Sequence, residues 1–208
     1  MLTPLTELSS LHNHSHFSVM DGISLPDEMV LTAKEKGLRS IAITDHGHAH
    51  AHADVYLSGK RHGVRTIFGV EAYVIHDLDE WHVLKDRVDL ERKTGDRDSN
   101  DIGDDRDAPV AADVGRKLRK KGHLVLLACN RVGLSNLYRL VYDSHRVGFY
   151  GKPRMDKKML AAHAGGLVAS SACMGGVISN RCWELQRGEC SWDDVVREAR
   201  EFDEIFGR

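Results

Sequence analysis

The sequence predicts an α/β fold built around a mostly parallel sheet. Five segments have the length of strands, and most are continuous apolar runs such as RSIAITD and HLVLLACN, which are typical of strands buried on both faces. Segments with helical periodicity separate them, and this alternation is the pattern of α/β proteins. With 208 residues, the chain is long enough for one domain with its own core.

The expected elements follow one another along the chain, apart from one acidic stretch. The expected strands are residues 10–14, 39–45, 65–75, 123–130 and 166–173. The expected helices are residues 25–37, 52–63, 113–122, 134–148, 157–165, 176–188 and 191–206. Pro26 suits a first helical turn, Gly37 and Gly63 suit helix ends, and Ser191 is a good N-cap.

An acidic segment interrupts this order. Residues 77–107 carry twelve acidic and six basic side chains, although the whole chain has a net charge of only −2. Residues 77–109 also lack a clear hydrophobic period, so we predict a solvated and at least partly disordered insertion. The remainder is mildly basic, which is too weak a signal to establish a nucleic-acid surface.

Composition argues for a protein of the reducing cytoplasm. No apolar run approaches the ~18 residues that a membrane helix needs, and the N-terminus MLTPLTELSS lacks the basic flank and apolar centre of a secretion signal. The four cysteines form no CxxC pair, so we expect free thiols. The thirteen histidines are the feature that composition leaves to be explained.

Side chains that bind metals gather at the expected strand ends. His12 and His14 alternate along the first strand, so both imidazoles point to one face. Asp45 and His46 end the second strand, and Glu71 lies inside the third. Chemistry in α/β folds gathers at the carboxyl ends of the strands, so we expect these groups to converge.

Three further residues extend this set. Cys173 ends the fifth strand, and Asp21 lies in the loop after the first. His123 is the exception, since it stands at the start of the fourth strand rather than at its end. Imidazole, carboxylate and thiolate together suit Zn²⁺, Mn²⁺ or Fe²⁺ better than Mg²⁺. Two or three such ions would activate water and clamp a phosphate, so phosphoester hydrolysis is the expected chemistry.

Each residue taken singly has a simpler structural explanation. A histidine at a strand end is more often a hydrogen-bonding residue than a ligand, Asp21 before Gly22 is a common turn residue, and cysteines such as Cys173 are commonly small buried apolar residues. Glu71 is less easily explained, because a carboxylate inside an apolar strand needs a partner. The joint pattern across strand ends therefore carries the hypothesis.

Several motifs in a fixed order resemble one known family. HNHSHFS matches the HxHxxxS first motif of the polymerase-and-histidinol-phosphatase (PHP) domain, with Ser18 as its serine. AITDHG, GVEAYV, LLACNRVGLSNLYRLV and SSACMGG resemble the successive signatures of the version at the N-terminus of the bacterial DNA polymerase III alpha subunit, a C-family DNA polymerase. The resemblance covers nearly the whole chain except the acidic insertion.

The resemblance implies a fold, a metal site and partners. It implies a distorted (β/α)7 barrel, with residues 1–208 as a single PHP domain and residues 77–109 as a flexible acidic insertion. It implies two or three divalent transition metal ions (Zn²⁺, Mn²⁺ or Fe²⁺). The implied ligands are His12, His14, Asp21, His46, Glu71, His123 and Cys173. The implied partners are DNA 3′ ends, the remainder of a C-family polymerase and replisome subunits, with no membrane.

Asp45 and His46 are the expected catalytic residues. By the resemblance, Asp45 is a neighbour that orients His46 or the bound water. Within the segments HNHSH and HGHAHAH, four histidines fall outside the family's ligand set: His16, His48, His50 and His52.

The chain departs from the family pattern in one important respect. The pattern ends with an Asp-x-His ligand pair on a late strand, and the sequence stops before that strand. Asp143 and His145 have this spacing, but they lie in a predicted helix, where positions i and i+2 point roughly 200° apart. We do not expect them to substitute, so the barrel is expected to lack its last strands and one side of its site.

Three functions stay open at this point. The first is a metal-dependent phosphoesterase that acts as a 3′–5′ exonuclease, a proofreading module in DNA replication. The second is an inactive module that braces a polymerase, which the missing Asp-x-His pair favours. The third is a free-standing phosphatase of the histidinol-phosphate type. No polymerase active site is expected, because a 208-residue chain occupied by this barrel leaves no room for one.

Overall fold

A seven-stranded sheet is the framework of the computed structural model, which describes residues 8–19, 21–94 and 112–207. Its main path runs in the order β1-β2-β3-β4-β7, while β6 pairs with β3 and β5 pairs with β6. The strands are β1 Ser9–Ser10, β2 Ser40–Ile43, β3 Arg65–Val74, β4 Gly122–Ala128, β5 Phe149–Tyr150, β6 Lys152–Met155 and β7 Leu167–Ser170. The sheet curls into a half-barrel, which confirms the predicted α/β class.

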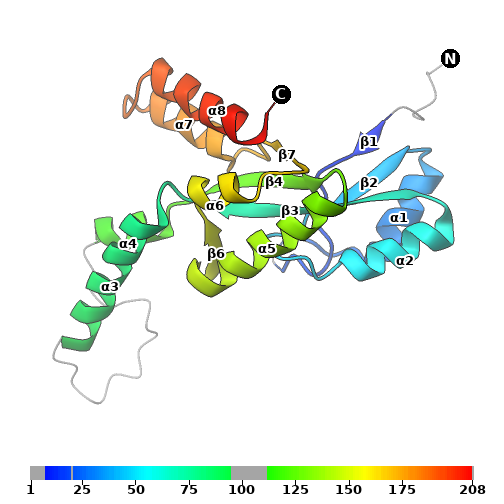
Figure 1. Ribbon diagram of the computed structural model, residues 1–208, viewed down its shortest axis with the longest axis horizontal. Helices are drawn as coiled ribbons and strands as arrows, with labels where there is room; N and C mark the ends of the chain where they lie inside the picture. Colours follow the sequence, from blue (N-terminus) through cyan, green and yellow to red (C-terminus); the bar gives the residue numbers. More distant parts are fainter. Residues whose placement is uncertain (1–7, 20, 95–111, 208) are drawn as a thin grey trace.

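Helices pack on this sheet and extend beyond it (Figure 1). They are α1 Pro26–Glu35, α2 His52–His62, α3 Leu78–Thr94, α4 Ala112–Arg119, α5 Arg131–Val147, α6 Lys157–Ala162, α7 Val177–Gln186 and α8 Trp192–Phe206. α1 packs against α2, α7 packs against α8, and the pair α3 and α4 projects from the rest of the molecule in Figure 1. In the described ranges, no helix is long and apolar enough to cross a membrane.

The predicted helix signals occupy their expected positions. Pro26 lies in the first turn of α1, and Gly37 follows that helix with a positive φ of 67°. Gly63 ends α2 in the left-handed conformation that glycine adopts without steric cost. Ser191 caps α8 by accepting a hydrogen bond from the backbone N–H of Asp194.

The direction of β4 differs from the predicted sheet. β1, β2 and β3 run parallel, as do β3 and β6, but β4 is antiparallel to both β3 and β7. The prediction of a mostly parallel sheet is therefore wrong at β4. The apolar run that predicts this strand indicates burial on both faces, and burial alone does not determine strand direction.

The shortest strands also differ from expectation. β1 ends at Ser10, so His12 and His14 lie in the segment after the strand rather than within it. Hydrophobic periodicity does not predict β5 or β6, because the first has two residues and the second, KPRM, has no apolar run.

The first part of the acidic segment is a helix. α3 spans Leu78–Thr94, within the segment predicted to be a solvated and at least partly disordered insertion. Trp81 and Val88 are buried in one cluster with Leu118 of α4, and Trp81 Nε1 donates a hydrogen bond to the Leu118 carbonyl at 3.1 Å. Leu78, Trp81, Leu84 and Val88 recur at spacings of three and four and form the apolar face that docks this charged helix, so a helical period is present that the prediction overlooked. Residues 95–109 of the predicted insertion lie outside the described part of the chain.

The main core determines which side of the sheet carries the site. Val70 and Ala72 of β3 belong to the buried cluster that also contains Leu137 and Leu140 of α5. Because neighbouring residues of a strand point to opposite faces, Glu71 projects from the other side of the sheet.

Candidate metal centre

A buried carboxylate lies at the centre of the site. Glu71 is fully buried, and its Oε2 lies 2.6 Å from Nε2 of His14 and 2.8 Å from Nε2 of His12. Its Oε1 lies 3.0 Å from Nδ1 of His123. Burial raises the pKa of Glu71, but hydrogen bonds with His12, His123 and His14 outweigh burial and hold that pKa far below its ordinary value. These contacts favour the carboxylate form of Glu71 in the interior.

Asp21 forms a second focus of contacts at the edge of the site. Its Oδ2 lies 2.7 Å from Nδ1 of His14 and 2.8 Å from Nε2 of His46. The hydrogen bond with Glu71 raises the pKa of His14, whereas burial lowers the pKa of His46. His46 is thus biased toward the neutral form, which is the form that binds metals.

These contacts create three overlapping groups whose ligand atoms lie within 4.8 Å of one another. The groups are His12 with His14 and Glu71, His14 with Asp21 and His46, and His46 with Glu71 and His123. Cys173 borders them, since its Sγ lies 3.4 Å from Nδ1 of His123 and 3.6 Å from Oε1 of Glu71. Each of the seven ligands that the family resemblance implies therefore touches another of them.

The segment after β1 directs two histidines at Glu71. Asn13 Nδ2 donates to the Ala42 carbonyl, and the Thr44 N–H donates to the Asn13 carbonyl, each at 2.8 Å. These bonds hold Asn13 against β2. Because alternate residues of an extended segment point to opposite sides, His12 and His14 project away from these bonds and toward Glu71.

The reversed strand accounts for the exceptional position of His123. β4 runs antiparallel to β3, and His123 near its start pairs with Tyr73 near the end of β3. The start of β4 and the end of β3 therefore meet at one edge of the sheet. Cys173 reaches the same edge after β7, where Ala172 has a φ of 62°, a left-handed conformation that is uncommon for a residue with a side chain.

Asp45 holds the histidine segment in place. Its buried carboxylate accepts hydrogen bonds from the Ser15 N–H at 2.6 Å and from Ser15 Oγ at 2.7 Å. The His46 N–H donates to Ser18 Oγ at 3.2 Å, so the motif serine holds His46 at its backbone. Asp45 thus binds Ser15, the residue that follows His14. The role of Asp45 in orienting His46 or bound water stays a prediction.

Tyr73 lies beside the cluster, although the sequence analysis gives it no role. Its ring stacks on His46 with centroids 5.2 Å apart and meets His123 edge-on at 5.3 Å. Burial, with Asp21 and Glu71 nearby, raises the pKa of Tyr73 to about 12, so its phenol is neutral at pH 7. The available signal was its spacing, because Tyr73 follows Glu71 by two residues and shares its face of β3.

The other histidines of the two histidine-rich segments have contacts outside the cluster. His48 and His50 stack on each other with centroids 4.4 Å apart, and His16 lies against Phe17 with the two rings tilted and their centroids 4.1 Å apart. His52 is buried, and its Nε2 bonds the Gly69 carbonyl at 2.9 Å.

The Asp-x-His pair of α5 is engaged within that helix. Asp143 accepts hydrogen bonds from Arg139 at 2.8 Å and Arg146 at 3.3 Å. His145 Nδ1 bonds the Val141 carbonyl at 2.9 Å. These are contacts of one helix with itself.

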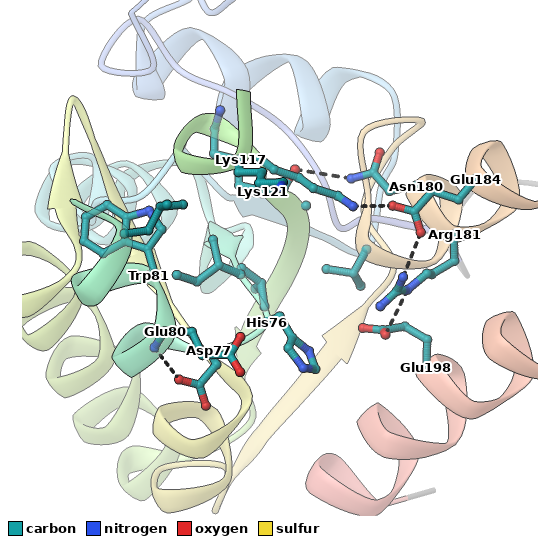
Figure 2. Close-up of a pocket in the computed structure, with 16 residues that line it drawn as sticks. His76, Asp77, Glu80, Trp81, Lys117, Lys121, Asn180, Arg181, Glu184 and Glu198 are labelled. Atoms are coloured by element: carbon teal, nitrogen blue, oxygen red, sulfur yellow. Dashed lines mark hydrogen bonds and ion pairs between the residues drawn. The ribbon is translucent and has the colours of Figure 1, made fainter. Parts of the chain in front are cut away.

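A separate cavity of about 350 Å³ lies between α3 and α4 on one side and α7 and α8 on the other (Figure 2). Two of its acidic residues are paired within it, because Glu184 binds Lys120 and Arg181, and Glu198 also binds Arg181. Lys121 lines this cavity and also lies over the Tyr73 ring, so it connects the cavity with the metal-ligand cluster.

Fold and site together define an α/β half-barrel with a candidate metal centre at one edge of its sheet. Four imidazoles, two carboxylates and a thiol are a donor set that suits divalent transition metals. The chain belongs to the PHP domain family, whose model matches residues 10–208.

The relatives of the chain are much longer proteins. DNA polymerase III subunit alpha of Campylobacter jejuni is 33% identical over 181 residues, which cover 87% of this chain and 12% of that protein. The Aquifex aeolicus protein of the same name is 32% identical over 199 residues, covering 95% of this chain and 14% of that protein. A solved structure of a proposed metal-dependent phosphoesterase from Bifidobacterium adolescentis aligns with a TM-score of 0.40 at 14% identity, covering 94% of this chain and 44% of that chain.

Removing the Ser15 hydroxyl tests how the histidine segment is held. Ser15→Ala leaves one oxygen of the buried Asp45 carboxylate without its partner, so the free energy of unfolding should fall by about 1–3 kcal/mol. Urea unfolding followed by circular dichroism measures the change. Ser170→Ala is the matched control, because Ser170 is exposed on β7. Equal stability losses in the two variants would contradict the role given to the Ser15–Asp45 contact.

Proposed function

We propose that this chain is a metal-dependent phosphoesterase domain that removes nucleotides from DNA 3′ ends as part of a replicative C-family polymerase. The observation that carries the proposal is the set of three overlapping ligand groups around Glu71. Membership of the PHP family and the relatives named DNA polymerase III subunit alpha support the polymerase context. The chain spans only 12% and 14% of those two relatives, so polymerase activity itself is not proposed for it.

The residues present fit a centre of two or three divalent transition metal ions. The proposed ligands are those of the three groups together with Cys173. Such ions, when bound, supply an activated water and positive charge that stabilises a phosphate under attack. Glu71, whose Oε2 faces His12 and His14 and whose Oε1 faces His123, would be a ligand common to two of the three groups.

The protein's own groups prepare the site for such chemistry. Ser18 fixes the backbone of His46, and Tyr73 fixes the plane of its imidazole by stacking. His46 and Asp45 are the proposed catalytic pair, with Asp45 acting through Ser15 on the segment that carries His14. The pKa of Tyr73 near 12 keeps its hydroxyl protonated, so it can donate a hydrogen bond to a phosphate oxygen.

One observation favours a second function, that of an inactive module bracing a polymerase. The only Asp-x-His spacing in the chain is Asp143–His145, and in the described structure both side chains bond within α5. The groups of ligands that the structure brings together could bind metal for stability without hydrolysis. Metal binding and hydrolysis must therefore be measured separately.

Neutralising Glu71 tests the metal centre. Protein purified without added ions should carry two or three transition metal ions per chain by inductively coupled plasma mass spectrometry. Glu71→Gln removes the charge that two of the three groups share, so most of this metal should be lost. Glu35→Gln is the matched control, because Glu35 is exposed at the end of α1 and should leave metal content unchanged. Equal metal content in all three proteins would contradict the proposed centre.

Removing one histidine tests the hydrolytic activity. With Mn²⁺ or Zn²⁺, the chain should shorten a labelled primer from its 3′ end, and His14→Ala should reduce the rate by roughly 10–100-fold or more, because His14 touches both Glu71 and Asp21. The exposed His76→Ala is the control. Denaturing gel electrophoresis of a 3′-recessed duplex gives the rate, with histidinol phosphate as the alternative substrate.

Two results would redirect this proposal. Intact primer ends together with a metal-dependent rise in melting temperature would support the bracing module, since ligand binding stabilises the folded state. Hydrolysis of histidinol phosphate but not of the duplex would support the small-molecule phosphatase.

A further inference from the structure

Two lysines gather on one aromatic ring beside the metal-ligand cluster. Lys121 Nζ lies 5.3 Å from the centroid of the Tyr73 ring, and Lys152 Nζ lies 5.6 Å from the same centroid. The Tyr73 ring is itself stacked on His46. Both ammonium groups are therefore one side chain away from a proposed metal ligand.

Strand register explains why these lysines converge. Tyr73 pairs with His123 on the antiparallel β4 and with Arg154 on the parallel β6. Lys121 precedes His123 by two residues, and Lys152 precedes Arg154 by two residues. Alternate residues of an extended chain share a face, so both lysines extend from the side of the sheet that carries the cluster.

The two ammonium groups have no carboxylate partner within residues 8–19, 21–94 and 112–207, the part of the chain that the structure describes. Among the residues that the structure describes, neither Lys121 nor Lys152 forms an ion pair or a side-chain hydrogen bond, and the contacts of both are with the Tyr73 ring. Their neighbours in sequence behave differently, since Lys120 binds Glu184 and Lys157 binds Glu198.

A third cation increases the positive charge at this place. Arg154 is 1% exposed, and its guanidinium donates hydrogen bonds only to the carbonyls of Tyr150 and Lys152 among the described residues. Its Nε has no partner there. A buried guanidinium bound to neutral carbonyls adds charge without compensation, so the lysines stand in a region of unbalanced positive charge.

We propose that Lys121 and Lys152 form a phosphate-binding subsite that holds a second phosphate group of a nucleic-acid strand while the first lies at the metal centre. The subsite deepens the proposed function and rests on it for the identity of the strand. Lysine ammonium groups bind phosphates as point charges, and the unpaired state of both leaves them ready to do so. The subsite would favour a strand with several phosphates over an ester with one.

The cation–π contacts alone are an insufficient explanation for this arrangement. One lysine over a tyrosine ring is a common stabilising contact. Two lysines on one ring repel each other, and Lys152 is exposed and free to turn toward solvent. Their convergence next to a proposed phosphoesterase centre is better explained by an anion that both would bind.

The test measures binding rather than hydrolysis. The full chain, loaded with Zn²⁺, is titrated into a fluorescent six-nucleotide thymidine strand with phosphorothioate linkages, and anisotropy gives the dissociation constant at several salt concentrations. Lys121→Gln/Lys152→Gln should weaken binding by about tenfold and reduce the slope of log K against log salt by about 1.4, since each single-strand phosphate contact contributes about 0.7. The single exposed variant Lys152→Gln should reduce the slope by about half as much.

Two controls make the result specific. Lys121→Arg/Lys152→Arg keeps both charges and should retain most of the affinity. Lys34→Gln/Lys36→Gln removes the same charge from exposed positions at the end of α1 and should change the affinity by less than about twofold. Circular dichroism melting verifies that every variant is folded.

Failure of the subsite and failure of the proposed function give different results. Unchanged binding in the Lys121→Gln/Lys152→Gln variant, an equal loss in the Lys34→Gln/Lys36→Gln control, or no binding by the wild type overturns the subsite. Wild-type hydrolysis of primer ends together with any of these results leaves the proposed function standing. Weakened binding in the variant, with no hydrolysis by the wild type, supports the subsite and overturns the exonuclease.

Discussion

The burial of one carboxylate is the constraint on which the site depends. An ionised glutamate inside a sheet is strongly unfavourable unless hydrogen-bond donors or cations surround it. Glu71 is fully buried, and the groups that compensate it come from three separate parts of the chain, carrying His12 and His14, His46, and His123. The fold must bring these parts together for Glu71 to be tolerated, so the same convergence that stabilises the carboxylate creates the ligand groups.

The surroundings of the cluster extend this logic outward. Asp45 is a second buried carboxylate, and it is satisfied by Ser15 rather than by a histidine, so it stabilises the segment without competing for ligands. Tyr73 closes one side of His46 with an apolar ring. Glu71 and Asp21 are the anionic groups of the cluster. Two cations, Lys121 before β4 and Lys152 of β6, lie over the Tyr73 ring beside it. The proposed metal centre, beside two lysines that have no carboxylate partner in the described structure, is an arrangement suited to a polyanionic substrate.

Much of this arrangement could be predicted from local sequence signals. Pro26 and Ser191 mark helix starts because their chemistry fits those positions, and the apolar runs locate β2, β3 and β4. The convergence of the candidate ligands was predicted from two signals, which are the alternation of His12 and His14 and the position of His46 and Cys173 at the ends of expected strands. The direction of β4 could not be predicted, because a run buried on both faces looks the same in either direction. The antiparallel direction of β4 is what brings His123, at the start of its strand, to the edge that carries the other candidate ligands. The Ser15–Asp45 contact and the docking of α3 through Trp81 depend on pairs of residues far apart in the sequence, which no local pattern reveals.

The central claim is that metal ions lie around Glu71 in a shared site. The most direct measurement is anomalous diffraction from crystals of the chain grown with Zn²⁺ or Mn²⁺, recorded on both sides of the metal absorption edge. The account predicts two or three anomalous peaks within about 2.0–2.3 Å of the ligand atoms of Glu71 and its surrounding histidines. Anomalous peaks confined to His48 and His50, or no peak within bonding distance of Glu71, would contradict it.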